Sequence, residues 1–395
     1  MKKQWLAVIN DNNLIVAHLA LKKNKLKIFF LDSLKLEENL NDYSSQKESN
    51  SFDYIKNWFR ANKIPCEKLK LTVSSLGLVT RVVSLPLMSR NDLEKLVNNQ
   101  ISQYFTIDIE NYIIDYKILN KYYENKKPMI NVLLAALPKQ KIASIWSICQ
   151  YLGFEPRVID LSADCLTRIY STLAARNKLS GDMVIVSLSE NKVEFVLLNK
   201  GIFFLYSDLE IDLKAIAAGL TKQNAERQTE GNSVPEESMQ AELEIASFLA
   251  RTKEFVLEDL YIPKEKIPFL NITESDLDPA QKIKHSKQLM YSKQSSANKD
   301  EDLPAEYSLN PLIAALAGLL SIYETSHYGK KVSKIYLTGE YCFLPYVPEI
   351  MSKNLGIDTV VGFPGWDPKI RVKNSKLSSD WPKYGSLYGL ALRED

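Results

Sequence analysis

The chain has 395 residues, a formal net charge of +2, 45% apolar residues and 25% charged residues. A chain of this length divides its core among two or more domains, and the composition is that of an ordinary soluble globular protein. The near-neutral charge excludes a broad basic footprint for nucleic acid. The longest apolar run, residues 312–323, falls short of the roughly 20 residues that a membrane span needs, so we expect a core helix there.

The cysteines and the amino-terminal residues bear on the cellular compartment. Cys66, Cys149, Cys165 and Cys342 are widely spaced and form no C-x-x-C motif. Cys149 and Cys165 lie in apolar helical patterns and are expected to be buried free thiols, which fits a reducing compartment. No secretory signal is recognisable after Met1. These features predict a cytoplasmic protein that reaches a membrane only through partners.

The amino-terminal segment predicts a β-meander. Strands are expected over residues 4–10, 14–21 and 27–31, because apolar runs there are separated by short polar turns. A polar stretch follows, and the spacing of apolar residues over 53–61 predicts a helix.

The next segment reads as a small sheet that carries one helix. A strand over 78–85 is followed by Ser89, which we expect to be the N-cap of an amphipathic helix. Residues 112–120 and 129–136 predict a hairpin whose polar turn spans 122–127. We expect these elements to form a subdomain inserted into the first of two lobes.

Two helices and a short strand return the chain to the first lobe. The helix over 139–152 is expected to end at Gly153, a good C′ residue. A strand follows over 157–160, and Ser162 is expected to cap a helix that runs to about Arg176.

A second meander is expected over 183–188, 193–198 and 202–207. Strand-turn-strand-turn-strand therefore occurs twice, which we interpret as a structural duplication. Duplicated meanders with flanking helices predict an α/β protein with the two-lobed actin/hexokinase-like architecture, a duplicated ribonuclease H-like fold. The remaining elements are expected as helices over 212–222, 241–252, 309–328 and 344–354, strands over 334–338 and 358–361, and a returning tail over 384–392.

The expected elements, together with one shift in composition, divide the chain into six segments. Residues 264–309 are rich in Lys, Ser and Asp, and are expected to be a flexible or partly disordered excursion. The predicted division is 1–77 and 137–180 for the first lobe, 78–136 for the inserted subdomain, 181–230 and 310–395 for the second lobe, and 231–309 for a second-lobe subdomain that contains the excursion.

Several short segments follow one another in an order and at a spacing that are typical of a known family. They are Arg81, Leu85-Pro86, Gln103-Tyr104-Phe105, residues 115–119, 132–139 and 153–156, Arg168, and residues 335–339 and 389–393. In this arrangement the chain resembles the PilM family of the FtsA/PilM superfamily, actin-like cytoplasmic proteins of type IV pilus assembly.

The resemblance implies a peptide-binding groove between the inserted subdomain and the first lobe, which receives the amino-terminal tail of PilN, a membrane-anchored partner. Arg81, Gln103, Tyr104 and Tyr116 lie in the matching segments. Apolar pockets and fixed hydrogen-bonding groups suit such a groove. The alternatives stay open at two positions: Tyr104 as a core aromatic of an amphipathic helix, and Arg81 as a salt-bridge partner within its own lobe.

Actin-like ATPases hold nucleotide phosphates with two meander turns and the adenosine side with a later glycine-rich turn. Bare backbone amides are required at the phosphate turns because a Cβ would intrude. Glycine is scarce here, at 14 residues in the whole chain. The candidate nucleotide-binding residues are Asn10, Asp11, Asn12 and Asn13 in the first turn, Ser187, Ser189, Glu190 and Asn191 in the second, and Thr338, Gly339 and Glu340 in the third.

Both phosphate turns lack glycine, and the second carries a carboxylate. We therefore expect ATP hydrolysis to be lost or very weak and no cofactor to be needed. The alternative keeps Asp11, Asn13 and Ser189 as Mg²⁺ and phosphate contacts, with ATP and Mg²⁺ as cofactors. No catalytic or metal-ligating set is expected from residue spacing.

Three functions are compatible with these features. The first is a cytoplasmic scaffold, a pseudo-ATPase of the pilus assembly machinery, at the inner face of the cytoplasmic membrane. It would bind a PilN-like tail and other inner-membrane platform proteins, and no nucleic acid. The second is an active actin-like ATPase whose nucleotide state regulates pilus assembly. The third is a component of a related type II secretion system.

Overall fold

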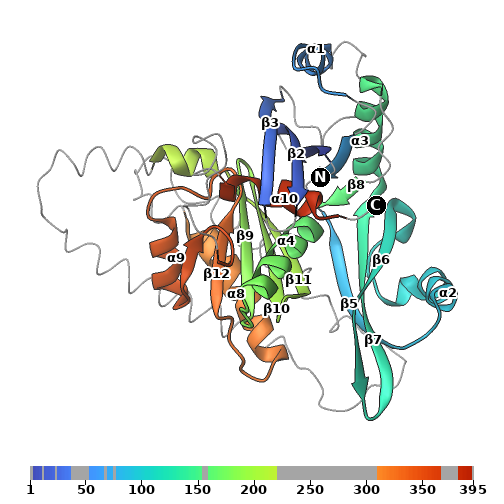
Figure 1. Cartoon of the computed structure of the whole chain (residues 1–395). Coiled ribbons are helices and arrows are strands. Elements are labelled where there is room, and N and C mark those ends of the chain that lie inside the picture. The colour runs from blue at the N-terminus through green and yellow to red at the C-terminus, as the bar shows by residue number, and fades with distance from the viewer. Residues whose placement is uncertain are drawn as a thin grey trace, which may run out of the picture.

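The computed structural model describes residues 3–10, 13–22, 25–36, 53–65, 69–73, 77–153, 159–219, 309–365 and 381–393. Within these residues the strands form two sheets of five strands and one sheet of three (Figure 1). The expected helix over 241–252 and the expected excursion over 264–309 lie outside the described residues.

The first five-stranded sheet is the centre of the first lobe. β1 (Lys3–Asn10), β2 (Asn13–Lys22) and β3 (Lys25–Lys35) form the predicted antiparallel meander. β4 (Leu69–Val73) and β8 (Ile159–Leu161) add to it in parallel, so that the strand order is β3-β2-β1-β4-β8.

Two helices cover one face of this sheet. α1 (Asp53–Ala61) and α3 (Lys139–Leu152) pack their apolar residues against β1, β2 and β4. Gly153 ends α3 with a φ of +79°, as predicted, because glycine adopts the left-handed conformation without a Cβ clash.

The second lobe repeats the plan. β9 (Met183–Ser189), β10 (Lys192–Asn199) and β11 (Ile202–Glu210) form the second meander. β12 (Lys334–Thr338) and β13 (Thr359–Val361) extend it in parallel, in the order β11-β10-β9-β12-β13. The predicted duplication is therefore confirmed by the topology.

The apolar run of the second lobe is a core helix, as predicted. It is α8 (Asn310–Ser326), which packs with α9 (Val347–Leu355) against the apolar face of β9, β10 and β12. In the part of the chain that the structure describes, no helix combines the length and apolarity needed to cross a membrane.

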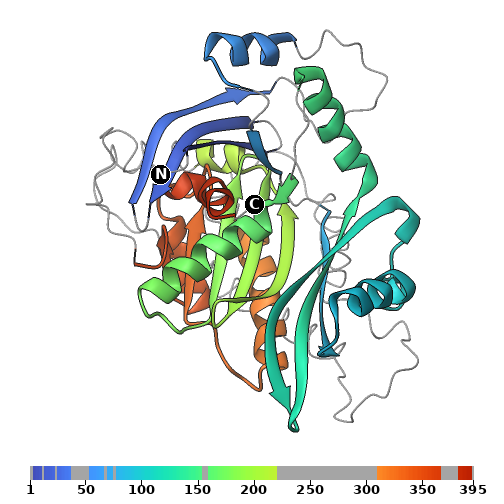
Figure 2. The same cartoon turned by 45° about the vertical axis from the view of Figure 1, so that its right-hand side comes forward.

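A pair of helices lies between the two sheets. α4 (Ser162–Arg176) and α10 (Gly385–Ala391), the latter preceded by the short helix η8 (Trp381–Tyr384), share one apolar cluster with both lobes (Figure 2). This cluster joins Leu6 of β1 to Ile185 of β9 through Leu166 and Leu387. The two lobes are thus packed together around one central layer.

The inserted subdomain is a three-stranded sheet with one helix. β5 (Val79–Pro86), β6 (Tyr112–Glu124) and β7 (Lys127–Pro138) pair in the order β5-β7-β6. α2 (Arg90–Gln100) covers one face, and the short turns η4 (Ile101–Gln103) and η5 (Ile109–Asn111) lead back to the sheet. The other face packs through Leu133 and Leu137 against the central layer.

Two local predictions in this region have different outcomes. Ser89 caps α2 as expected, because its Oγ accepts the Asp92 N–H at 3.2 Å. The hairpin is longer than predicted, since Tyr122 and Tyr123 still pair with Met129 and Pro128. Its turn is only Asn125-Lys126, with φ of 49° and 63°, and such tight turns match the twist of paired strands.

Candidate functional site

The three turns expected to hold nucleotide lie at the ends of strands. Asn10 ends β1 and Asn13 begins β2, while Asp11 and Asn12 lie outside the described residues. Ser187 and Ser189 belong to β9, and Glu190 and Asn191 form the turn to β10. Thr338 ends β12 and pairs with Ser187, so that Gly339 and Glu340 follow directly beside the second turn.

Side chains from the two lobes meet across these turns. The Asn13 side-chain amide donates to Glu340 Oε2 at 2.8 Å. Lys35 Nζ of the first lobe lies 3.5 Å from Glu190 Oε1 of the second. The structure therefore brings the second and third turns together and places Asn13 and Lys35 of the first lobe against their carboxylates.

Gly339 is required by a crossing of the chain. Its φ is +91°, and a Cβ on it would lie 2.5 Å from the carbonyl oxygen of Leu188. The Gly339 N–H donates to the Pro382 carbonyl at 3.1 Å, and the Thr338 hydroxyl donates to the same oxygen. The glycine of the third turn thus permits close packing of two backbones, and its amide already has an acceptor.

Two carboxylates of the second lobe, Glu190 and Glu340, lie at these turns, and the lysines Lys35 and Lys383 lie close enough to affect the Glu340 carboxyl. Partial burial raises the pKa of the Glu340 carboxyl, and the negative charge of Glu190 raises it further. The bond from Asn13 and the charges of Lys35 and Lys383 oppose this rise in pKa. A polyphosphate placed here would meet two carboxylates, and only a cation could offset their repulsion.

The raised pKa of Glu340 predicts a pH-dependent effect on stability. The folded chain holds this proton more tightly than the unfolded chain, so the ionised carboxylate lowers the free energy of unfolding as the pH rises through the folded pKa. Glu340→Gln removes the charge and keeps an oxygen for Asn13. We expect it to raise the free energy of unfolding above neutral pH, by ~0.5 kcal/mol or less because the group is partly exposed, and to have little effect in acid.

Thermal melts of the two proteins across the pH range measure this difference. Glu94→Gln, at an exposed position of α2, is the matched control and should shift the midpoint equally little at every pH. A gain for Glu340→Gln that is the same in acid and in base would contradict the assignment.

A buried ion pair next to the second turn was missed by the sequence reasoning. Lys192 Nζ and Glu194 Oε1 lie 3.0 Å apart, with their side chains 2% and 5% exposed. Ser162 Oγ donates to Glu194 Oε1 at 2.7 Å, and the Tyr206 hydroxyl does so at 3.2 Å. The available signal was two opposite charges, two residues apart, on one face of an otherwise apolar strand.

The expected role of Ser162 as a helix cap is wrong. Ser162 is the first residue of α4, Leu161 occupies the N-cap, and no side-chain capping bond forms. The Ser162 hydroxyl is instead taken by Glu194 from the second-lobe sheet. Ser162 lies one position inside the helix, past the N-cap position from which a side-chain oxygen accepts an N–H of the first turn.

A second ionic network joins segments that carried the family resemblance. Asp160 Oδ2 lies 3.1 Å from Arg168 and 2.9 Å from Arg393. Arg168 also binds Asp164, which Lys117 of β6 contacts from the inserted subdomain. Burial by itself raises the pKa of Asp160, but the charges of Arg168 and Arg393 overcome it and leave that pKa below its ordinary value.

This network brings together segments that are distant in the sequence. Arg168 Nη1 also donates to the Gly389 carbonyl at 2.9 Å. Residues 115–119, Arg168 and residues 389–393 therefore meet at one junction of the inserted subdomain, α4 and α10. The junction is structural, since its charged groups satisfy one another.

The four predicted peptide-binding residues lie in the inserted subdomain. Arg81 and Tyr116 share a row across the sheet with Leu134, on the face that α2 covers. Arg81 Nε donates to the Tyr104 carbonyl at 3.1 Å. Gln103 is exposed in η4. This face is opposite to the one that packs on the central layer, and the assignment of these residues to a peptide groove stays a prediction.

The hydroxyl oxygens of Tyr104 and Tyr116 are buried. Within the described residues, the hydroxyls of Tyr104 and Tyr116 have no hydrogen-bond partner. Burial raises the pKa of Tyr104. Tyr104 and Tyr116 pack against the apolar cluster under α2, so the alternative of a core aromatic fits Tyr104. Arg81 binds the backbone at Tyr104, directly after η4.

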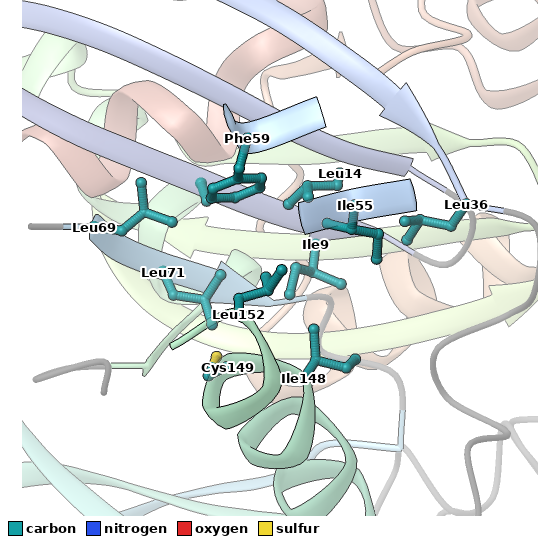
Figure 3. A pocket seen from close by; sticks show the side chains of 11 residues that line it. Ile9, Leu14, Leu36, Ile55, Phe59, Leu69, Leu71, Ile148, Cys149 and Leu152 are labelled. Carbon is teal, nitrogen blue, oxygen red and sulfur yellow. The ribbon is translucent and has the colours of Figure 1, made fainter. Parts of the chain in front are cut away.

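A cavity in the first lobe is part of the core. It measures about 10 Å³, about the space of one water probe. Only apolar side chains line it, from β1, β2, β4, α1 and α3 and from Leu36 directly after β3 (Figure 3). Cys149 is among them, and burial raises the pKa of its thiol to about 12. The predicted buried free thiols at Cys149 and Cys165 are confirmed.

Two lobes on one plan, a helix pair between them and a subdomain inserted into the first lobe define an actin-like protein of the α/β class. The chain belongs to the PilM family: the model described as "Type IV pilus assembly protein PilM" matches residues 9–208. The resemblance read from the sequence segments is thereby confirmed.

The fold is shared with a solved structure, and two further solved structures are more distantly similar. A chain of the "PilM-PilN type IV pilus biogenesis complex" is 16% identical, with a TM-score of 0.62, over 99% of this chain and 98% of that chain. A Bacteroides thetaiotaomicron protein with an actin-like ATPase fold and unknown function is 10% identical, with a TM-score of 0.39, over 100% of this chain and 96% of that chain. Ethanolamine utilization protein EutJ from Carboxydothermus hydrogenoformans is 9% identical, with a TM-score of 0.41, over 99% and 90%. No curated protein sequence matches this chain.

Proposed function

We propose that the chain is a scaffold of the type IV pilus assembly machinery. It lies in the cytoplasm at the inner face of the membrane and binds the amino-terminal tail of a PilN-like membrane protein. Membership of the PilM family supports the pilus role. The fold shared with a chain of a PilM–PilN complex supports the choice of partner.

The scaffold role rests on one observation at the phosphate turns. Asn13 and Lys35 of the first lobe are bonded to Glu340 and Glu190 of the second. A phosphate would have to displace these contacts and approach two carboxylates, while the Gly339 amide is occupied. We therefore propose that the cleft holds the lobes together and that its nucleotide site is degenerate.

Calorimetric titration with ATP and Mg²⁺ tests the degenerate site. We expect no saturable binding at ATP concentrations up to about 1 mM, so that any binding free energy is weaker than roughly −4 kcal/mol. We also expect no phosphate release above background. Micromolar binding with turnover would show an active ATPase instead of a pseudo-ATPase.

A synthetic peptide with the sequence of the PilN-like tail tests the partner. We expect saturable binding to the full chain, and about tenfold weaker binding for Gln103→Arg, a loss of ~1.4 kcal/mol. Gln103 is the better probe because it is exposed, whereas Arg81→Glu would also break the bond that holds Tyr104. Fluorescence anisotropy of the labelled peptide measures both affinities.

The matched control is Thr325→Arg, a neutral-to-arginine change at an exposed position of α8 in the second lobe. It should bind the peptide like the unmodified chain. Loss of binding in both variants, or in neither, would count against the predicted peptide surface. Absence of binding by the unmodified chain would remove the proposed partner.

A further inference from the structure

The β6–β7 hairpin ends in a tip that projects away from both lobes. Its turn, Asn125-Lys126, is the lowest part of the drawn ribbon in both views (Figures 1 and 2). We call residues 121–128, together with Leu87, the hairpin tip. Leu87 belongs to it because its N–H donates to the Pro128 carbonyl at 2.9 Å.

The hairpin tip combines exposed aromatic and apolar side chains with lysines. Tyr123 is 79% exposed and Leu87 is 44% exposed. Lys121, Lys126 and Lys127 are all exposed, and none of the three forms an ion pair within the described residues. Glu124 is the single acidic residue of 121–128, so the hairpin tip carries a net positive charge.

This composition suits the interface of a lipid bilayer. Tyrosine has an apolar ring and a polar hydroxyl, and it is enriched at the depth of lipid headgroups. Lysine extends its apolar stem along such a surface and keeps its ammonium group at the headgroups. Lysines close to an anionic leaflet each add to the attraction. A two-residue turn presents these side chains at the end of a stiff, paired ribbon.

We propose that the hairpin tip contacts the surface of an anionic phospholipid bilayer directly. Tyr123 and Leu87 enter the headgroup region, and Lys121, Lys126 and Lys127 bind the anionic headgroups. The contact is independent of any bound tail peptide, because it uses only residues of this chain. It would add a second attachment to a chain that a membrane-anchored partner also holds.

Vesicle sedimentation with the full chain tests the electrostatic part. Vesicles of phosphatidylcholine containing phosphatidylglycerol should bind the chain, and vesicles of phosphatidylcholine alone should not. The triple change Lys121→Glu, Lys126→Glu and Lys127→Glu should lower the binding at least tenfold. Binding should also fall as salt rises from about 0.1 M to about 1 M, because the screening length shrinks from ~10 Å to ~3 Å.

The matched control reverses the same number of charges elsewhere. Lys178, Lys200 and Lys331 are exposed, and the first two have positive φ like Lys126. Their triple change to glutamate should leave vesicle binding within about twofold of the unmodified chain. Equal losses in the two triple variants would overturn the proposal, since the attraction would then follow net charge alone.

Insertion is tested by fluorescence, which does not depend on the lysines. Tyr123→Trp should be quenched by brominated phospholipids in the anionic vesicles. Tyr328→Trp, at a fully exposed residue near the end of α8, should be quenched much less. Equal quenching at the two positions, or no binding of the unmodified chain to anionic vesicles, would overturn the proposal even if the tail peptide binds.

Discussion

Gly389→Ala is expected to destabilise the chain by about 3 kcal/mol or more, the range of severe overpacking. Gly389 lies where α10 crosses α4, and a Cβ on it would stand 1.8 Å from the carbonyl oxygen of Cys165. The obstacle is backbone, so no side chain can rotate away. The two helices would have to separate, and with them the central layer that joins the lobes.

Gly318→Ala is the matched control. Gly318 lies within α8, and a Cβ there meets no atom within 4 Å. Alanine is the better helix former, so this variant should be unchanged or more stable by up to ~1 kcal/mol. Denaturant unfolding followed by circular dichroism compares the midpoints. A Gly389→Ala midpoint close to that of the unmodified chain would show that the crossing tolerates a methyl group.

Lys192→Met is expected to cost about 3–5 kcal/mol, because it leaves the Glu194 carboxylate buried without its cation. Glu194 is 4% exposed and is held at the start of α4 by Ser162. Because the carboxylate is buried, solvent does not replace the lost ammonium group. Unfolding near neutral pH, where the carboxylate is ionised in the unfolded chain, gives the loss.

The double variant Lys192→Met with Glu194→Gln should recover most of that stability. Glutamine removes the buried charge and still offers an oxygen to Ser162 and Tyr206, and neutral replacement of a buried pair often costs little. The thermodynamic cycle of the two single variants and the double variant measures the coupling. Additive losses would mean that Lys192 and Glu194 do not depend on each other.

Local patterns predicted most of the secondary structure. Both meanders, α8, the Ser89 cap and the Gly153 terminus were expected from alternation, helical spacing and turn residues, and each is confirmed. These features depend on neighbours within a few positions of the chain. The PilM resemblance likewise came from short segments in order, and the family match confirms it.

The predictions that changed involve partners far away in sequence. Ser162 has the local signature of a cap, yet a carboxylate from the second-lobe sheet takes its hydroxyl. Lys192 and Glu194 carry opposite charges on one strand, and their mutual burial follows only from the packing of β10 on α4. The signal at the hairpin turn was composition alone, so the pairing of Tyr122 and Tyr123 was missed.

The sequence by itself determined most of the strands and helices, the two-lobed architecture and the family, because these follow from local periodicity and from short segments in order. Only the tertiary structure decided what the turns touch. Asn13 and Glu340 are 327 positions apart and bonded at 2.8 Å, and Gly389 of α10 meets Cys165 of α4 within the central layer. No local pattern encodes such contacts, since they form only when both lobes close on α4 and α10.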